Sequence, residues 1–294
     1  MGPVSGEEQK KRIFARLARE RRLNGENDPT QYLLSAEEMC NNEYPLPSYV
    51  SDVSQLGDGW VETPQDDPID ASLKARSNVL ALDCEMVSLY LELGLTLSKE
   101  IFQCQTEDGK ELTRVCIIDG NTEKVILDEL VKPIKPITDY LTRYVVYIAY
   151  SEPSDHSIFL SFSGITANHL ASVTTTLPMV QAKLLTLITP HTILLGHSLE
   201  QDLRALKLAH PRCIDTALIF HHPRGRPLKP GLAWLTKRWC GREIQTGGEG
   251  GHDPEEDARA CLELFKKKMA CGMCFFFGLN HRGNDEYGHR PWVW

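Results

Sequence analysis

The chain has 294 residues, which is enough for one or two domains, and its 41% hydrophobic and 24% charged residues are ordinary values for a globular protein. No apolar run approaches the roughly 18 residues of a membrane-spanning helix, and the N-terminal residues lack the apolar core of a signal peptide, so we expect neither. Nine cysteines without an export signal indicate reduced thiols, and a net charge of −8 argues against a protein that mainly binds duplexes non-specifically.

Residues 1–77 differ in composition from the rest of the chain and are predicted to form an N-terminal extension and linker. A basic, helix-prone stretch covers residues 10–22, and a short helix is predicted over residues 34–40. Residues 43–70 are rich in Pro, Gly, Ser and Asp, which is typical of an extended linker or wrap. The basic stretch is either a nuclear-import or RNA-contact segment or simply a solvated helix. We expect the ordered domain to cover residues 78–280 and a tail to cover residues 281–294.

Strand and helix signals alternate from residue 78 onward. Three sequential strands come first, and the dipeptide Gly120-Asn121, which is typical of a hairpin turn, joins the second to the third. The order predicts an α/β fold with a mixed sheet covered by helices. The predicted strands are residues 79–86, 112–119, 124–131, 192–196 and the start of 212–220, and the predicted helices are residues 177–188, 199–209, 231–239 and 254–269.

Two carboxylates lie on one face of the first predicted strand. Asp83 and Glu85 are two residues apart, so their side chains point the same way, whereas Leu80, Leu82, Cys84 and Met86 point the other way. Two acids on a buried face repel each other and lose hydration unless a cation lies between them. A divalent metal is the natural cation because hard cations prefer carboxylate oxygens. Acids that simply face solvent at a strand end are the alternative, which is the more common one for an isolated D-x-E.

Two helices each carry an aspartate on their inward face. Ser198 and Gln201 match a capping box, and Asp202 lies on the apolar stripe of the helix that follows. Asp253 is predicted as the next N-cap, with Pro254 at N1, Glu256 at N3 and Asp257 facing inward. His252 lies just upstream, after a glycine-rich loop. A surface aspartate and a solvated histidine are the plainer alternatives.

The segments LALDCEM, LLGHSLEQDLRALKL, IDTALIFHH and GHDPEEDARACLEL resemble the motifs of the DEDDh exonuclease superfamily. More narrowly, they resemble the eukaryotic Rex-type RNA exonucleases, over about residues 78–280. The resemblance implies a ribonuclease H-like exonuclease fold and 3′→5′ hydrolysis of RNA to nucleoside 5′-monophosphates. It further implies action in the nucleus, including the nucleolus, on RNA 3′ ends such as those of rRNA and tRNA precursors. We therefore expect an RNA 3′ end as the partner, and no membrane.

The resemblance also assigns roles to residues of this chain. Asp83, Glu85, Asp202 and Asp257 correspond to the ligands of two divalent cations, Mg²⁺ or Mn²⁺, and His252 corresponds to the general base. Such ions would let an acidic protein bind phosphates. Met86, Arg224 and Lys229 are expected to contact the RNA. A solvated positive face is the alternative for the basic cluster, which comprises Arg224, Arg226, Lys229, Lys237 and Arg238.

Two stretches depart from the family pattern, at about residues 87–103 and 145–162. Without residues 87–103 the chain reads LALDCEMCQTEDGKELTRVCIID, which follows the family closely. Both stretches can be encoded with GT and AG at their ends, so we hypothesise that one or both are unspliced introns; genuine insertions are the alternative. The first stretch begins directly after Met86, where the family places the RNA 3′ end. We therefore predict that the chain as written is less active than a chain without it.

Two other functions stay open at the level of sequence. The residues that would hydrolyse a phosphodiester do not distinguish sugars, so a single-stranded DNA exonuclease of the same chemistry is one alternative. An inactive RNA-binding scaffold, disabled by the two stretches, is the other.

Overall fold

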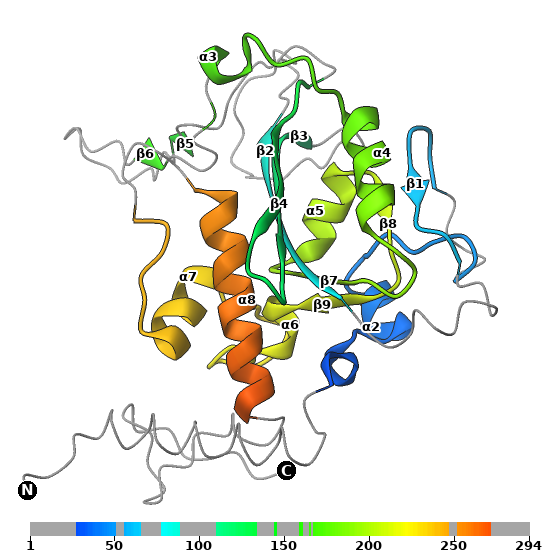
Figure 1. Cartoon of the computed structure of the whole chain (residues 1–294). Helices are drawn as coiled ribbons and strands as arrows, with labels where there is room; N and C mark the ends of the chain where they lie inside the picture. Colours follow the sequence, from blue (N-terminus) through cyan, green and yellow to red (C-terminus); the bar gives the residue numbers. More distant parts are fainter. Residues whose placement is uncertain are drawn as a thin grey trace, which may run out of the picture.

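A five-stranded mixed sheet forms the centre of the molecule (Figure 1). The computed structural model describes residues 28–50, 56–65, 78–88, 110–133, 144–145, 159–160, 165, 167–246 and 252–271. The β2–β3 and β3–β4 pairs are antiparallel, and the β2–β7 and β7–β9 pairs are parallel. This sheet confirms the predicted α/β class. Its strands, in spatial order, are β4 (Val125–Leu130), β3 (Lys110–Asp119), β2 (Val79–Ser88), β7 (Ile193–Gly196) and β9 (Cys213–Asp215).

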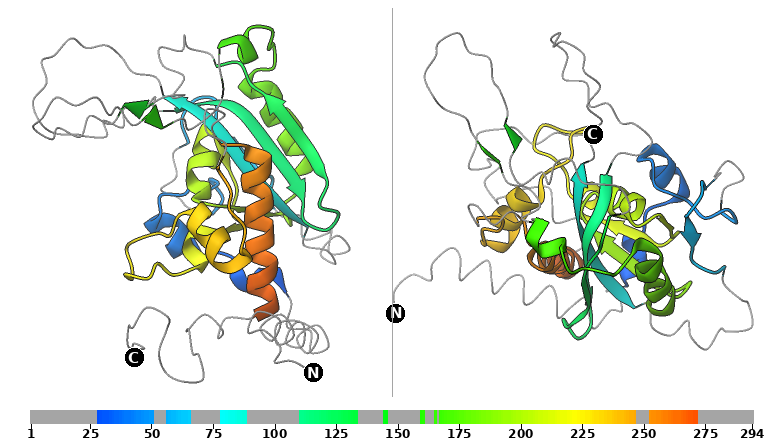
Figure 2. Two further views of the ribbon diagram at one scale, coloured as in Figure 1. Left: turned by 90° about the vertical axis from the view of Figure 1, so that its left-hand side faces the viewer. Right: turned by 90° about the horizontal axis from the view of Figure 1, so that it is seen from above.

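Helices cover both faces of the sheet. The long helix α8 (Pro254–Cys271) packs on one face, against β2 and β3, while α4 (Leu177–Leu187) and α5 (Leu199–Ala205) lie on the other, as both views of Figure 2 show. Side chains alternate along β2 accordingly. Leu80 and Leu82 pack in the core on the α4 and α5 side, and Ala81 packs in the core on the α8 side. The odd-numbered acids of β2 therefore share the face that α8 covers.

The segment before β2 belongs to the same cores. Tyr32 is buried on the α8 side, whereas Met39 and Leu46 are buried on the α4 and α5 side, and the Leu34 N–H donates to the Cys213 carbonyl across 2.9 Å. A short parallel pair, β1 with β8, attaches residues 56–65. The elements outside the central sheet are η1 (Pro29–Tyr32), α2 (Ala36–Asn41), β1 (Val61–Glu62), β5 (Tyr144–Val145), β6 (Phe159–Leu160), α3 (Ala167–Leu170), β8 (Leu208–Ala209), α6 (Thr216–Ile219), α7 (Leu232–Leu235) and η3 (Thr236–Cys240).

The turn between β3 and β4 lies where the two predicted strands leave it, and it runs from Gly120 to Lys124. Glu123 in this turn is left-handed with φ 58°, and the Asp119 carboxylate accepts the N–H groups of Asn121 and Thr122. The predicted end of one helix was wrong. Helix α5 ends at Ala205 and not at residue 209, because Leu208 pairs with Val61 in the parallel β1–β8 ladder.

Several predictions concern residues outside the described ranges. They are the basic stretch at 10–22, the C-terminal tail at 281–294 and nearly all of the two departures from the family pattern at 87–103 and 145–162. Within the described part of the chain, no helix is both long enough and apolar enough to cross a membrane.

Candidate active site

The four predicted acids come from three elements and lie beside the middle of β2. Asp83 and Glu85 lie on the face of β2 that α8 covers, Asp257 lies in the first turn of α8, and Asp202 lies in α5. Asp83 is partly exposed, whereas the other three side chains are buried, each with at most 7% of its surface accessible. The strand period puts Asp83 and Glu85 on one face of β2, and the helix period turns Asp202 and Asp257 inward, where both are buried.

Specific contacts fix the two helical acids. The Cys84 N–H, which lies between the two strand acids, donates to Asp202 Oδ1 across 2.9 Å and ties α5 to β2. The Gln245 side-chain amide donates to Asp257 Oδ2 across 2.8 Å. The other oxygen, Asp257 Oδ1, is buried and makes no hydrogen bond. A buried carboxylate oxygen without a partner is costly, which makes Asp257 a candidate ligand for a cation.

Desolvation raises the pKa of every member of the set, and neighbouring carboxylates raise it further. Desolvation is the largest cause for all four. Asp202, Asp257 and Glu85 add to it and hold the pKa of Asp83 well above its ordinary value. Desolvation, then Asp257 and Asp202, raise the pKa of Glu85 to about 9. The pKa of Asp257 rises to about 6 despite the Gln245 hydrogen bond, and the pKa of Asp202 rises well above its ordinary range although Cys84 opposes the shift. Asp202, Asp257 and Glu85 therefore lie close enough to Asp83 to raise its pKa.

The donor set suits hard divalent cations. Carboxylate oxygens are the preferred ligands of Mg²⁺ and Mn²⁺, and a cation would relieve both the repulsion and the unpaired Asp257 Oδ1. Among the residues that the structure describes, no three His, Cys, Asp or Glu side chains are already arranged around one ion position. The acids therefore fit the cations by the chemistry of their oxygens.

His252 lies directly before α8 and beside Asp257. Its Nδ1 atom is 3.7 Å from Asp257 Oδ2, and its side chain is partly exposed. Desolvation lowers the pKa of His252 below 6.5, although Glu256 opposes the shift. A neutral imidazole at the edge of the acidic set can accept a proton from water.

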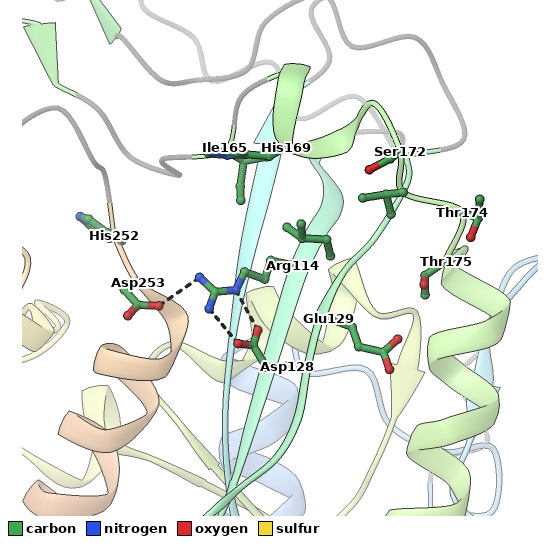
Figure 3. Close-up of a pocket in the computed structure, with 12 residues that line it drawn as sticks. Arg114, Asp128, Glu129, Ile165, His169, Ser172, Thr174, Thr175, His252 and Asp253 are labelled. Atoms are coloured by element: carbon green, nitrogen blue, oxygen red, sulfur yellow. Dashed lines mark hydrogen bonds and ion pairs between the residues drawn. The ribbon is translucent and has the colours of Figure 1, made fainter.

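Arg114 is a member of the site that sequence reasoning missed. It is paired with Glu85 in the β2–β3 register and lowers the pKa of that acid. Its guanidinium donates to both oxygens of Asp128 across 2.8 and 2.9 Å and to Asp253 Oδ1 across 3.1 Å (Figure 3). Arg114 therefore links β3, β4 and the start of α8. The β2–β3 register places Arg114 opposite Glu85. The sequence alone does not give the register of two strands that a long loop joins.

Of the two predicted helix caps, the structure contains the one at Asp253 and lacks the one at Ser198. Asp253 does cap α8, because its Oδ1 accepts the Glu255 N–H across 3.3 Å and Pro254 is the first helical residue. The capping box at Ser198 was wrong. Ser198 is left-handed, with φ 53° and ψ 45°, and its side chain makes no capping bond. The buried carboxylate of Asp215 accepts the Ser198 N–H instead, across 2.9 Å.

A cavity of about 780 Å³ opens beside the acids. Arg114, His252 and Asp253 line it on one side, and the segment from His169 to Thr175 lines it on the other (Figure 3). None of the four acids lines the cavity. Its volume is within the range of small-molecule and nucleotide sites.

Of the three predicted substrate-binding residues, Met86 lies in β2, and Arg224 and Lys229 lie in the loop between α6 and α7. Met86 follows an irregularity in the β2–β3 register and packs partly buried on the α4 and α5 side. Lys229 Nζ is 3.1 Å from Glu200 Oε1, which holds Lys229 beside the start of α5. Arg224 is exposed in the loop after α6, and its backbone N–H donates to His222.

A mixed sheet in this order, with helices on both faces and acids beside the middle of β2, is the ribonuclease H-like exonuclease fold. The Pan2 catalytic unit of Neurospora crassa, which contains protease and nuclease domains, shares this fold. The match has a TM-score of 0.50 and 22% identity, and it covers 73% of this chain and 31% of that one. The Pan2 module of Saccharomyces cerevisiae in complex with AAGGAA RNA matches at a TM-score of 0.50 and 23% identity, over 83% of this chain and 37% of that one.

Sequence relatives support the same class of protein. An uncharacterized exonuclease of Schizosaccharomyces pombe is 40% identical over 291 residues, which are 98% of this chain and 39% of that protein. RNA exonuclease 1 of Saccharomyces cerevisiae is 39% identical over 249 residues, or 84% of this chain and 36% of that protein. Over most of its own length the chain is thus similar to proteins named exonuclease and RNA exonuclease, which supports the resemblance to DEDD-type RNA exonucleases that its motifs predicted. It spans about two fifths or less of the length of these relatives, and no protein-family model matches it.

Proposed function

We propose that this chain is a metal-dependent 3′→5′ exoribonuclease that trims RNA 3′ ends, such as those of rRNA and tRNA precursors, to nucleoside 5′-monophosphates. One observation carries the proposal: four carboxyl groups from β2, α5 and α8 repel one another, and the buried Asp257 Oδ1 has no partner. Sequence relatives that are named RNA exonuclease support RNA as the substrate.

We assign Asp83, Glu85, Asp202 and Asp257 as the ligands of two divalent cations, Mg²⁺ or Mn²⁺. When bound, such ions neutralise the phosphate and make a bound water more acidic. His252 would accept the proton of the attacking water, because it is neutral near pH 7 and lies at the edge of the set. Arg114 would hold Asp253, and with it the backbone next to His252. The cavity beside Arg114 would receive the RNA strand that leads to the acids.

End-labelled oligonucleotides test the proposal. RNA labelled at its 5′ end should shorten stepwise with Mg²⁺, whereas RNA labelled at its 3′ end should release labelled mononucleotide at once. Both reactions should stop with EDTA and with Asp83→Ala. Faster shortening of a matched single-stranded DNA would favour the DNA exonuclease. RNA binding without metal-dependent shortening would favour the inactive scaffold and contradict the proposal.

We further propose that the protein acts in the nucleus, including the nucleolus, by resemblance to the Rex-type enzymes. Imaging of the tagged full chain tests this location, and an exclusively cytoplasmic signal would contradict it.

A further inference from the structure

Asp215, the last residue of β9, is a fully buried acid outside the four candidate ligands. Its two oxygens accept three hydrogen bonds. Oδ1 accepts the N–H groups of Ser198 and Ala217 across 2.9 and 2.8 Å, and Oδ2 accepts the Tyr44 hydroxyl across 2.7 Å. Desolvation raises the pKa of Asp215, but these three donors oppose the rise. The carboxylate thus joins three segments that are distant in the sequence.

The hydrogen bond from the Ser198 N–H to Asp215 holds a strained backbone position. Ser198 adopts the left-handed conformation without help from its own side chain, and this conformation is strained for a residue other than glycine. Helix α5 begins at the next residue and carries Asp202, whose Oδ1 accepts the Cys84 N–H. Because α5 is short, the position of its first residue largely sets where Asp202 points.

The hydrogen bond from Tyr44 connects the N-terminal segment to Asp215. Tyr44 is 5% exposed and packs in the same core as Met39 and Leu203. The preceding residue, Glu43, accepts two bonds from Arg204 Nη2 at the far end of α5, with its carbonyl across 2.7 Å and its carboxylate across 3.1 Å. Two adjacent residues therefore contact α5 at both ends, Tyr44 through Asp215 and Glu43 through Arg204.

We propose that Tyr44 and Asp215 are positioning residues, which clamp the start of α5 so that Asp202 faces the acids of β2 and α8. The inference rests on the proposed function and deepens it, since it makes the segment before the exonuclease domain a part of the active unit. Neither residue is assigned a contact with the cations or the RNA. Their effect passes through Ser198 and the axis of α5 to Asp202.

The test compares Tyr44→Phe and Asp215→Asn with the full wild-type chain. Tyr49→Phe is the matched control, because it removes a hydroxyl of the same segment that donates to the Thr63 carbonyl, away from α5. The measurements are Mn²⁺ affinity by calorimetry, hydrogen exchange of residues 198–202, and kcat and KM on RNA. Tyr44→Phe and Asp215→Asn should each speed exchange in this stretch and weaken Mn²⁺ binding roughly fivefold or more. They should also lower kcat about tenfold with KM within about twofold, whereas Tyr49→Phe should match the wild type.

The outcomes separate the two proposals. If the wild type shortens RNA and Tyr44→Phe keeps its Mn²⁺ affinity and kcat, the inference is wrong. A lower melting temperature alone, with both values retained in the folded protein, also overturns it, since the contact then only stabilises the fold. If the wild type neither binds Mn²⁺ nor shortens RNA, the proposed function is wrong. In that case, faster exchange at Ser198 in Tyr44→Phe still supports the clamp, and unchanged exchange overturns it.

Discussion

Arg114 is a cation that joins three elements beside a cluster of acids. Its removal should therefore lower both the activity and the stability. Arg114→Gln removes the ion-pair partner of Asp128 and Asp253 and the positive charge that lowers the pKa of Glu85. We expect kcat on RNA to fall about tenfold or more and stability to fall by about 1–3 kcal/mol. Single-turnover RNA shortening and urea unfolding measure the two effects.

Two further variants separate charge from geometry. Arg114→Lys keeps the charge but cannot form the two-pronged bond to Asp128, so it should recover only part of the loss. Arg259→Gln removes an exposed partner of Glu255 on α8 and should cost less than about 1 kcal/mol with kcat unchanged. An Arg114→Gln enzyme with wild-type kcat would show that this guanidinium has no part in the site.

His210 should make the fold sensitive to acid. It is fully buried, Nε2 donates to the Thr192 carbonyl and Nδ1 accepts from the Thr63 hydroxyl, so the neutral ring satisfies both bonds. Desolvation, with a smaller contribution from Arg212, lowers its pKa to about 4, although the bond to Thr192 opposes the shift. An unfolded histidine titrates near 6.5, so the folded state binds fewer protons between these values. Stability is therefore complete above about pH 6.5 and is lost as the pH falls toward 4.

The size of this loss can be measured by urea unfolding at pH 7 and pH 5. The full shift corresponds to about 3 kcal/mol, part of which is lost by pH 5. His210→Asn should be less stable than the wild type at pH 7 and should lose less on acidification. His222→Asn, in a loop, is the control and should follow the wild type. Equal slopes for His210→Asn and the wild type would contradict the prediction.

At the scale of elements, local sequence patterns predicted the direction in which side chains face, because the strand and helix repeats set that direction. The alternation of β2 and the helical stripes of α5 and α8 were enough to direct Asp83, Glu85, Asp202 and Asp257 inward. The start of α5 was not predictable in this way, since the Ser198 N–H that precedes it donates to Asp215, the last residue of β9. The Arg114 contacts likewise depend on a strand register and on β4, which no short window of sequence specifies. Local signals therefore fix which way side chains face, and distant contacts fix how they are held.

The β2–β3 hairpin allows a direct test of the first departure from the family pattern. Deletion of residues 87–103 removes the pairs Val87↔Glu111 and Ser88↔Lys110 but keeps every pair from Leu80↔Asp119 to Met86↔Leu112. Residues 104–111 would then join the strands, so the deleted chain should fold. It should also cleave RNA faster, roughly tenfold in kcat/KM, because the apolar stretch follows directly on Met86 beside the acids.

Asp83→Ala in the deleted chain is the control, and it should abolish the activity if the same site is responsible. Equal activity of the two chains would contradict the prediction. Sequencing of the mature transcript answers the separate question of origin, and a message that retains the stretch would exclude an unspliced intron.

At the scale of the whole molecule, residues 28–50 are shared between both faces of the sheet. We predicted that the ordered domain starts near Asn78, and that boundary stays a prediction. The earlier segment nevertheless supplies Tyr32 to the α8 side and Met39, Tyr44 and Leu46 to the other side. Each of these buried side chains contributes about 1.5–3 kcal/mol, and a typical domain has only about 5–15 kcal/mol of net stability. The segment and the sheet should therefore unfold together.

Met39→Ala tests whether the segment and the sheet unfold together. Met39 is 1% exposed, so its truncation should lower the free energy of unfolding by about 2–5 kcal/mol while leaving one cooperative transition. Circular dichroism and tryptophan fluorescence, followed in the same urea titration, should give coincident curves for the wild type and the variant. Val50→Ala, at 39% exposed in the same segment, should change stability by less than about 1 kcal/mol. Separate transitions in Met39→Ala would show that the segment is an independent attachment, and Asp202 would then have to be positioned without it.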